Sequence, residues 1–253
     1  MLEQFVDSHC HLNFSPLASN IASVLNRAKA RGVSKIVVPA YDSASWQPIV
    51  ALERAYENVY SAIGIHPWVA DKPMSAEALK HTLRNSSAVA VGEIGLDFKV
   101  DVPKKQQIDV FERQLSVAQE FDLPVILHVR GAFEEMLSIL EAQSKKIKGV
   151  VHAFSRGPQL AERFAALGLH IAFGGAVTHQ RAKRARRAAA TLPLDTVLIE
   201  TDAPSIGLDG VLPIEVEPAH TADVAAALAA IRQVSIETIA EVTTHNATEL
   251  FNL

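Results

Sequence analysis

The chain has 253 residues, of which 49% are hydrophobic and 21% charged, and its formal net charge is −4. Proteins that bind duplex nucleic acid through their overall charge are usually basic, so any nucleic-acid contact of this acidic chain has to be local. The single cysteine, Cys10, excludes an intrachain disulfide, and the lack of a secretory signal or of an apolar run of about 18 residues predicts a cytoplasmic protein without a membrane span.

Short runs rich in β-branched residues alternate along the chain with longer segments of helical pattern. Most of the short runs are almost entirely apolar, which is typical of parallel strands covered by helices. We predict strands at residues 5–9, 35–40, 59–65, 89–94, 124–129, 149–154, 170–174 and 196–201. Helices are predicted between them at residues 20–31, 45–56, 75–85, 106–121, 158–167 and 181–191.

Two more helices are predicted after the last strand, at residues 218–232 and 235–251. The first completes an eighth strand–helix unit, and the second is an extra C-terminal helix. Eight such units in a chain of about 250 residues predict an α/β fold, the (β/α)8 or TIM barrel, with residues 1–253 as a single domain. A doubly wound open sheet has the same alternation and is the alternative fold.

Potential metal ligands stand at the ends of several predicted strands. In barrels of this kind the working side chains lie at the C-terminal ends of the strands. Side chains alternate between the two faces of a strand, so His9 and His11 point the same way, into the barrel, and Cys10 points outward. The candidate ligands are His9, His11, Glu93, His128, His152 and Asp202.

Each candidate ligand also has an ordinary structural interpretation. A single histidine is more often a hydrogen-bonded core residue, Glu93 could pair with a lysine at the barrel rim, and Asp202 could be a turn residue before Pro204. Six such residues at one end of a barrel favour a metal site, because an apolar interior does not accept that many polar groups uncompensated. Four histidines and two carboxylates exceed the needs of one tetrahedral ion, so we predict two divalent cations bridged by a carboxylate.

Four further residues are expected close to these ligands. Asp7 and Glu200 fall on inward faces one layer below them, where they either orient imidazoles or pair with a buried lysine or arginine. Arg130 lies two residues beyond His128, where its guanidinium could hold a phosphate oxygen or form a salt bridge at the rim. His66, at the end of the third predicted strand, is predicted to touch the scissile group of a substrate, with the capping of a loop as the alternative.

One dense basic segment runs from Arg181 to Arg187 at the start of a predicted helix, near the mouth of the barrel. Such a segment could attract a phosphodiester chain despite the acidic total. The alternative is a solvated helix face.

Seven segments of the chain form a combination typical of one family: FVDSHCHL (5–12), AIGIHP (62–67), VAVGEIGLDF (89–98), LPVILHVR (123–130), VVHAFS (150–155), LIETDAP (198–204) and HNATELF (245–251). In them the chain resembles the TatD-type metal-dependent hydrolases, a branch of the amidohydrolase-like barrels. The resemblance extends from Phe5 to the end of the chain, and it is close to a bacterial subgroup of the family rather than to its best-studied nucleases.

The resemblance implies a role for each candidate ligand. One cation would be held by His9, His11, Glu93 and Asp202. The second would be held by Glu93, His128 and His152, with Glu93 bridging the two. Other branches of these barrels bridge with a carboxylated lysine on the fourth strand, and Glu93 takes that place here. Ligand type does not select one metal, since zinc, manganese, magnesium and iron all suit such a set.

The segment after the eighth predicted strand departs from the family pattern. Family members often continue from Asp-Ala-Pro with an arginine and an Asn-Glu-Pro sequence. Residues 205–220 keep Glu217-Pro218 but contain neither an arginine nor an asparagine. Because this loop helps to wall the substrate cleft, the resemblance says least about the substrate.

The expected activity is hydrolysis of an ester bond, as in a phosphodiesterase or deoxyribonuclease of TatD type acting on DNA or another phosphodiester. Asp202 is expected to accept the proton of the attacking water, so Asp202 and Glu93 are the candidate catalytic residues, while His66 and Arg130 are the candidate substrate-binding residues. One alternative is an amidohydrolase or esterase acting on a small metabolite, which the acidic charge favours; another is a catalytically idle barrel that binds metal or a partner. The sequence implies no protein partner.

Overall fold

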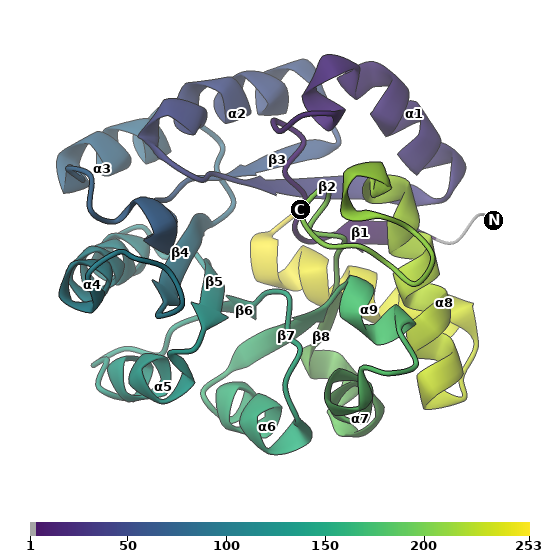
Figure 1. The fold of residues 1–253 in the computed structure, drawn as a ribbon. Coiled ribbons are helices and arrows are strands. Elements are labelled where there is room, and N and C mark those ends of the chain that lie inside the picture. Colours follow the sequence, from purple (N-terminus) through teal and green to yellow (C-terminus); the bar gives the residue numbers. More distant parts are fainter. Residues whose placement is uncertain (1–3) are drawn as a thin grey trace.

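In the part of the chain that the structure describes, eight parallel strands form an inner wall that helices surround, as the view in Figure 1 shows. This computed structural model describes residues 4–253. The strands are β1 (Phe5–Asp7), β2 (Val33–Pro39), β3 (Val59–Ala62), β4 (Val91–Asp97), β5 (Val125–Arg130), β6 (Gly149–Val151), β7 (Leu169–Phe173) and β8 (Val197–Ile199). The helices are α1 (Ile21–Ala30), α2 (Ser43–Ala55), α3 (Ala76–Arg84), α4 (Lys104–Glu120), α5 (Phe133–Glu141), α6 (Pro158–Ala166), α7 (Lys183–Thr191), α8 (Thr221–Arg232) and α9 (Ile236–Phe251).

Backbone hydrogen bonds close the strands into a barrel. The strands pair in two parallel runs, β1-β2-β3 and β4-β5-β6-β7-β8. Between β3 and β4, the N–H of Ile63 donates to the carbonyl of Ala90 at 3.1 Å, and between β8 and β1 the N–H of Ser8 donates to the carbonyl of Ile199 at 3.1 Å. Both gaps between the runs are therefore bridged, as a TIM barrel requires and an open doubly wound sheet does not.

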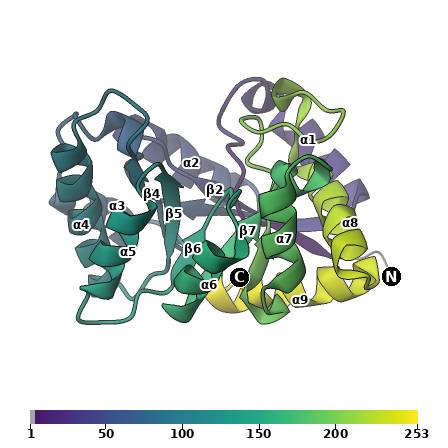
Figure 2. The same cartoon turned by 60° about the horizontal axis from the view of Figure 1, so that its bottom comes forward.

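The inside of the barrel is filled by one layer of apolar side chains and capped by the last helix. The layer takes one residue from each strand or its edge: Val6, Val37, Ala62, Ala90, Ile126, Val150, Ala172 and Leu198. Ala247 and Phe251 of α9 pack against this layer, and α9 lies across the N-terminal end of the barrel (Figure 2). The predicted extra helix thus closes the end opposite to the mouth.

Several helices begin where a side chain caps them. Asn20 accepts a hydrogen bond from the Ser23 N–H at the start of α1, and Ser235 accepts one from the Thr238 N–H at the start of α9. These side chains satisfy backbone donors that have no partner inside the helix. By contrast, α5 is absent from the sequence prediction, and the residue before it, Ala132, makes no side-chain cap. The residues before α4, α6 and α7 make no side-chain cap either, and these helices were predicted, so the missing cap does not explain the omission.

At the mouth of the barrel, β4 and β5 extend beyond their predicted ends, to Asp97 and Arg130, whereas the other strands end earlier than predicted. The sixth strand ends at Val151 and the eighth at Ile199, so His152 and Asp202 lie in the loops that follow. The backbone explains the difference, because Ala153 and Asp202 have positive φ angles of 47° and 52°, which a strand does not allow. Within residues 4–253, no helix has both the length and the apolar character needed to span a membrane.

Candidate metal centre

The six candidate ligands converge at the mouth of the barrel from five different parts of the chain. Glu93 lies within β4 and His128 within β5, whereas His152 follows β6 and Asp202 follows β8. His9 and His11 follow β1, which ends at Asp7, and their Nε2 atoms lie 3.3 Å apart; they point the same way as predicted, although neither lies in a strand. Cys10 between them is buried in the apolar layer outside the barrel. All six side chains are buried or nearly so.

The carboxylate of Glu93 lies at the middle of this cluster and faces it with both oxygens. Its Oε2 lies 3.3 Å from His9 Nε2 and 3.6 Å from His11 Nε2. Its Oε1 lies 2.7 Å from His152 Nε2 and 2.9 Å from His128 Nδ1. Burial by itself raises the pKa of Glu93, but the charges of His152, His66 and His9 outweigh burial and hold this pKa well below its usual value.

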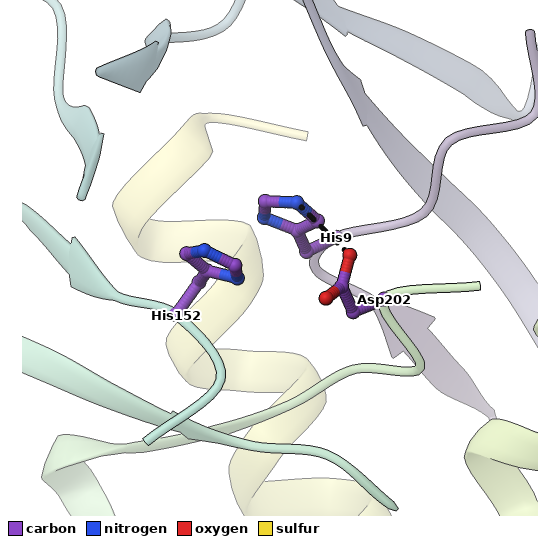
Figure 3. A group of neighbouring side chains, drawn as sticks. All are labelled: His9, His152 and Asp202. Atoms are coloured by element: carbon purple, nitrogen blue, oxygen red, sulfur yellow. Dashed lines mark ion pairs between the residues drawn. The ribbon is translucent and has the colours of Figure 1, made fainter. Parts of the chain in front are cut away.

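Asp202 lies close to the same pair of histidines that the Oε2 atom of Glu93 faces. Its Oδ1 lies 3.6 Å from His9 Nε2 and 3.4 Å from His11 Nε2. The ring of His152 stacks on the ring of His9, with centroids 4.0 Å apart and planes at 12°, and Figure 3 shows these two rings beside Asp202. Burial raises the pKa of Asp202, yet the hydrogen bond from His11 and the charge of His9 lower it below its usual value, so the carboxylate is ionised.

The donor set fits divalent cations. Bare nitrogens of neighbouring imidazoles face each other, as in the 3.2 Å contact of His128 Nδ1 with His152 Nε2, and both face a buried carboxylate. Cations between them would compensate this concentration of lone pairs. In three overlapping groups the ligand atoms lie within 4.8 Å of one another: His9, His152 and Asp202; His9, His11 and Glu93; and His66, Glu93 and His128.

The two deeper carboxylates differ in what they hold. Glu200 accepts a hydrogen bond from the Ala153 N–H at 2.6 Å and lies 3.6 Å from His152 Nδ1, which fits the predicted orientation of an imidazole. Asp7 instead accepts hydrogen bonds from the N–H and the hydroxyl of Thr201, at 3.0 and 2.6 Å, and so ties β1 to the loop after β8. Burial raises the pKa of Asp7 to about 7 although both of these bonds lower it. Among residues 4–253, neither carboxylate forms an ion pair with lysine or arginine.

His66 combines both of the roles considered for it. It caps the short helix η2 (Pro67–Val69), where its Nδ1 accepts a hydrogen bond from the Trp68 N–H at 3.2 Å. Its Nε2 lies 3.3 Å from Glu93 Oε1, inside the centre. Because Nδ1 is the acceptor, the neutral ring carries its hydrogen on Nε2 and presents a donor to the centre.

Arg130 lies at the rim of the barrel, with a side chain that is 58% exposed. Its Nη1 is 3.7 Å from Asp97 Oδ2, so the salt bridge considered for it is present in a loose form. Because the contact is long and the arginine is largely exposed, although Asp97 is buried, the pair contributes little to stability, and the guanidinium is free to turn toward a ligand at the mouth.

One buried carboxylate beside the centre was missed by the sequence reasoning. Asp97, the last residue of β4, accepts hydrogen bonds from Trp68 Nε1 at 2.7 Å and from the Lys99 N–H at 2.9 Å, and it lies 3.5 Å from His128 Nε2. Burial raises its pKa, but its contacts with His128, Trp68 and Lys99 outweigh burial and lower it to about 2. The predicted fourth strand ended at residue 94, whereas β4 continues to Asp97, so the prediction placed this carboxylate outside the strand.

The loop after β8 contains no arginine in residues 205–220, but an arginine from another part of the chain contacts it. Glu217 receives hydrogen bonds from Arg27 of α1, at 2.8 Å from Nε and 2.6 Å from Nη2. This two-point contact fastens the loop to the first helix.

The basic segment has four exposed side chains and one, Arg186, that is hydrogen-bonded within the protein. Arg181, Lys183, Arg184 and Arg187 are exposed at the start and along the outer face of α7. Arg186 instead donates to the carbonyl of Val177 at 2.6 Å and holds the short helix η3 (Gly175–Thr178). Whether the exposed members contact nucleic acid stays a prediction.

A closed barrel that gathers buried histidines and carboxylates at the C-terminal ends of its strands has the architecture of a metal-dependent hydrolase. The chain belongs to the TatD family, because the sequence profile described as TatD related DNase matches residues 6–252.

Individual relatives agree with this assignment. The chain is 39% identical to the protein named uncharacterized metal-dependent hydrolase YjjV of Escherichia coli K12, over 100% of both chains. It is 34% identical to the uncharacterized metal-dependent hydrolase YabD of Bacillus subtilis 168, over 98% of each. The crystal structure of the TatD homolog YjjV superimposes on this structure with a TM-score of 0.95, over 100% of both chains at 38% identity.

Proposed function

We propose that the centre holds two divalent cations bridged by Glu93 and that the enzyme hydrolyses phosphodiester bonds, with DNA as the substrate class. One observation carries the proposal: the two oxygens of Glu93 face two different pairs of histidines, His9 with His11 and His128 with His152. A carboxylate placed in this way can bridge two ions. The DNA substrate is supported by the description of the matching family as TatD related DNase.

The ligands divide between the two sides of Glu93. On the Oε2 side, His9, His11 and Asp202 would hold one cation. On the Oε1 side, His128 and His152 would hold the other. We leave His66 out of the ligand set, because its Nε2 carries the hydrogen when its Nδ1 accepts from Trp68 and so has no lone pair to offer.

The side chains around the ligands would serve the reaction. Divalent cations bound here would supply an activated water at neutral pH and positive charge opposite the scissile group. Asp202 would accept the proton of that water, since its carboxylate is ionised and lies among the ligands. His66 would donate its Nε2–H to an oxygen of the scissile phosphate, and Arg130 would bind a second phosphate oxygen from the rim.

The experiment is to remove the metals with a chelator and to refill the protein with zinc, manganese, magnesium or iron separately. Bound ions are counted by mass spectrometry and located by anomalous scattering, and each sample is assayed on single-stranded DNA, a chromogenic phosphodiester and a panel of lactones and amides. We expect two ions per chain and phosphodiester turnover that returns with at least one metal. A single ion per chain, or turnover confined to lactones or amides, would contradict the proposal.

The second candidate function is hydrolysis of an ester or amide in a small metabolite. The net charge of −4 favours it, because a polyanionic substrate is repelled by an acidic protein at long range. The same substrate panel separates the two candidates.

A further inference from the structure

The imidazole of His128 faces a carboxylate on each side. Its Nδ1 lies 2.9 Å from Glu93 Oε1, toward the centre, and its Nε2 lies 3.5 Å from Asp97 Oδ2, away from it. Nε2 is buried and has no hydrogen-bond partner within residues 4–253. A short movement of the ring toward Asp97 would therefore give a buried donor its acceptor.

We propose that Asp97 is a positioning residue, which accepts the Nε2–H of His128 and thereby fixes the tautomer whose Nδ1 lone pair points into the centre. The expected effect of Asp97 on cation affinity rests on the proposed function, whereas its expected effect on the tautomer of His128 does not. A carboxylate that holds the second nitrogen of a ligating histidine orients the ring and makes it a stronger ligand.

The structure holds Asp97 in place from several directions. Its side chain is fully buried, with Oδ1 bonded to the Lys99 N–H at 2.9 Å and Oδ2 bonded to Trp68 Nε1 at 2.7 Å. Its backbone is clamped by Gln107 of α4, which accepts from the Asp97 N–H at 2.7 Å and donates to the Asp97 carbonyl at 2.8 Å. The carboxylate is thus placed by the scaffold, and the ring of His128 has to adapt to it.

A second histidine of the centre has the same arrangement. His152 turns Nε2 to Glu93 Oε1 at 2.7 Å, and its Nδ1 lies 3.6 Å from Glu200. In the described part of the chain, the outward Nδ1 atoms of His9 and His11 have no hydrogen-bond partner. The outward nitrogens of His128 and His152 lack a hydrogen-bond partner within residues 4–253 as well, but each of these two has a carboxylate close behind it, at 3.5 and 3.6 Å.

Asp97 also connects this support to the mouth of the barrel. Trp68, which donates to Asp97 Oδ2, is 44% exposed, and Arg130 approaches the same oxygen to 3.7 Å. Replacing Trp68 by phenylalanine removes one donor to Asp97 but leaves the carboxylate in front of His128. Trp68→Phe is therefore the matched control for a general disturbance of this region.

The test measures cation affinity and the His128 tautomer in the full chain. Metal-free wild type, Asp97→Ala, Asp97→Asn, His128→Ala, Asp97→Ala/His128→Ala and Trp68→Phe are titrated with zinc in a calorimeter. We expect Asp97→Ala to lower the affinity for one of the two zinc ions by about 10–100-fold. Asp97→Asn should recover part of the loss, since its amide oxygen still accepts a hydrogen bond, and Trp68→Phe should bind zinc like wild type.

The double variant separates positioning from a structural role. If Asp97 acts through His128, adding Asp97→Ala to His128→Ala weakens zinc binding no further, whereas additive losses overturn the proposal. Wild-type zinc affinity in Asp97→Ala overturns the proposal too. If Asp97→Ala loses one whole equivalent of bound zinc and Asp97→Asn does not restore it, Asp97 is a ligand itself, and the proposal is also overturned. If circular dichroism shows that Asp97→Ala does not fold, the zinc affinity of Asp97→Asn is compared with that of the wild type instead.

The tautomer is measured without metal, from the ¹⁵N shifts of the His128 ring. Hydrogen on Nε2 in wild type and a mixed population in Asp97→Ala support the inference, and an unchanged tautomer in the variant overturns it. Failure of the wild type to bind two cations would instead overturn the proposed function, while the ring shifts still decide the role of Asp97.

Discussion

Asp202 occupies a backbone position that few side chains tolerate, with a φ angle of 52°. Asparagine is one of them, so Asp202→Asn keeps the turn while it removes the charge that would accept a proton. We expect kcat to fall by about 10²–10⁴-fold, the usual contribution of a general base, with little change in thermal unfolding of the metal-free protein. Steady-state kinetics and calorimetry measure the two effects, and a near-normal kcat would remove Asp202 from the catalytic role.

Arg130 tests the substrate class at the same scale. Its side chain is largely exposed and its ion pair with Asp97 is loose, so Arg130→Ala should leave stability almost unchanged. We expect kcat/KM to fall on phosphodiesters by about 10-fold or more, as for a lost charge-assisted hydrogen bond, and to change little on uncharged esters. Equal losses on both kinds of substrate would exclude recognition of phosphate by this residue.

Among the elements, the contact of β4 with β5 sets the position of His128. Gly95 has a φ angle of 142°, and a Cβ added to it would lie 2.0 Å from the carbonyl oxygen of His128. Gly95→Ala must therefore push the strands apart and move a candidate ligand.

We expect Gly95→Ala to lose stability and cation affinity together. The control is Gly168→Ala, which also has a positive φ, 88°, but no atom within 4 Å of the added Cβ. That variant should cost about 1–3 kcal/mol of unfolding free energy and leave zinc affinity unchanged. If calorimetric titration gives both variants the wild-type affinity, the approach of the two strands does not position His128.

The exposed basic side chains at the start of α7 can be tested for contact with a nucleic-acid substrate. Arg181, Lys183 and Arg184 are exposed, whereas Arg186 holds η3 and should be left intact. If the exposed side chains contact phosphates, replacing these three by glutamine lowers kcat/KM on DNA and flattens its dependence on salt by about one unit of logarithmic slope per lost contact. A salt dependence identical to that of wild type would identify this segment as a solvated helix face.

At the scale of the whole molecule, stability depends on closing the end of the barrel opposite to the mouth. Phe251 of α9 is fully buried against the apolar layer inside the strands. Phe251→Ala should lower the free energy of unfolding by about 3–5 kcal/mol, as for other large side chains removed from a core. Glu249→Ala, at an exposed position of the same helix, is the control for denaturant unfolding, and an equal cost in both variants would show that α9 is not needed to seal the core.

The barrel and the ligand types could be predicted because they follow from local patterns. Apolar runs predicted the strands, and the alternation of side chains placed His9 and His11 on one face. The structure confirms the TIM barrel and brings His9, His11, Glu93, His128, His152 and Asp202 together, although their roles as ligands remain predictions. No residue range was predicted for α5, although eight strand–helix units require a helix between β5 and β6.

The amino-acid sequence by itself determined that the candidate ligands gather at the mouth of this barrel, because the apolar strands that carry or precede them are patterns of short segments. Only the tertiary structure decided how these residues face each other: the two sides of Glu93, the nitrogen that His66 presents, and the carboxylate of Asp97 behind His128. Such contacts depend on the register between strands and on the loops that cross the mouth. Register joins residues far apart in the chain, and no pattern within one segment contains it.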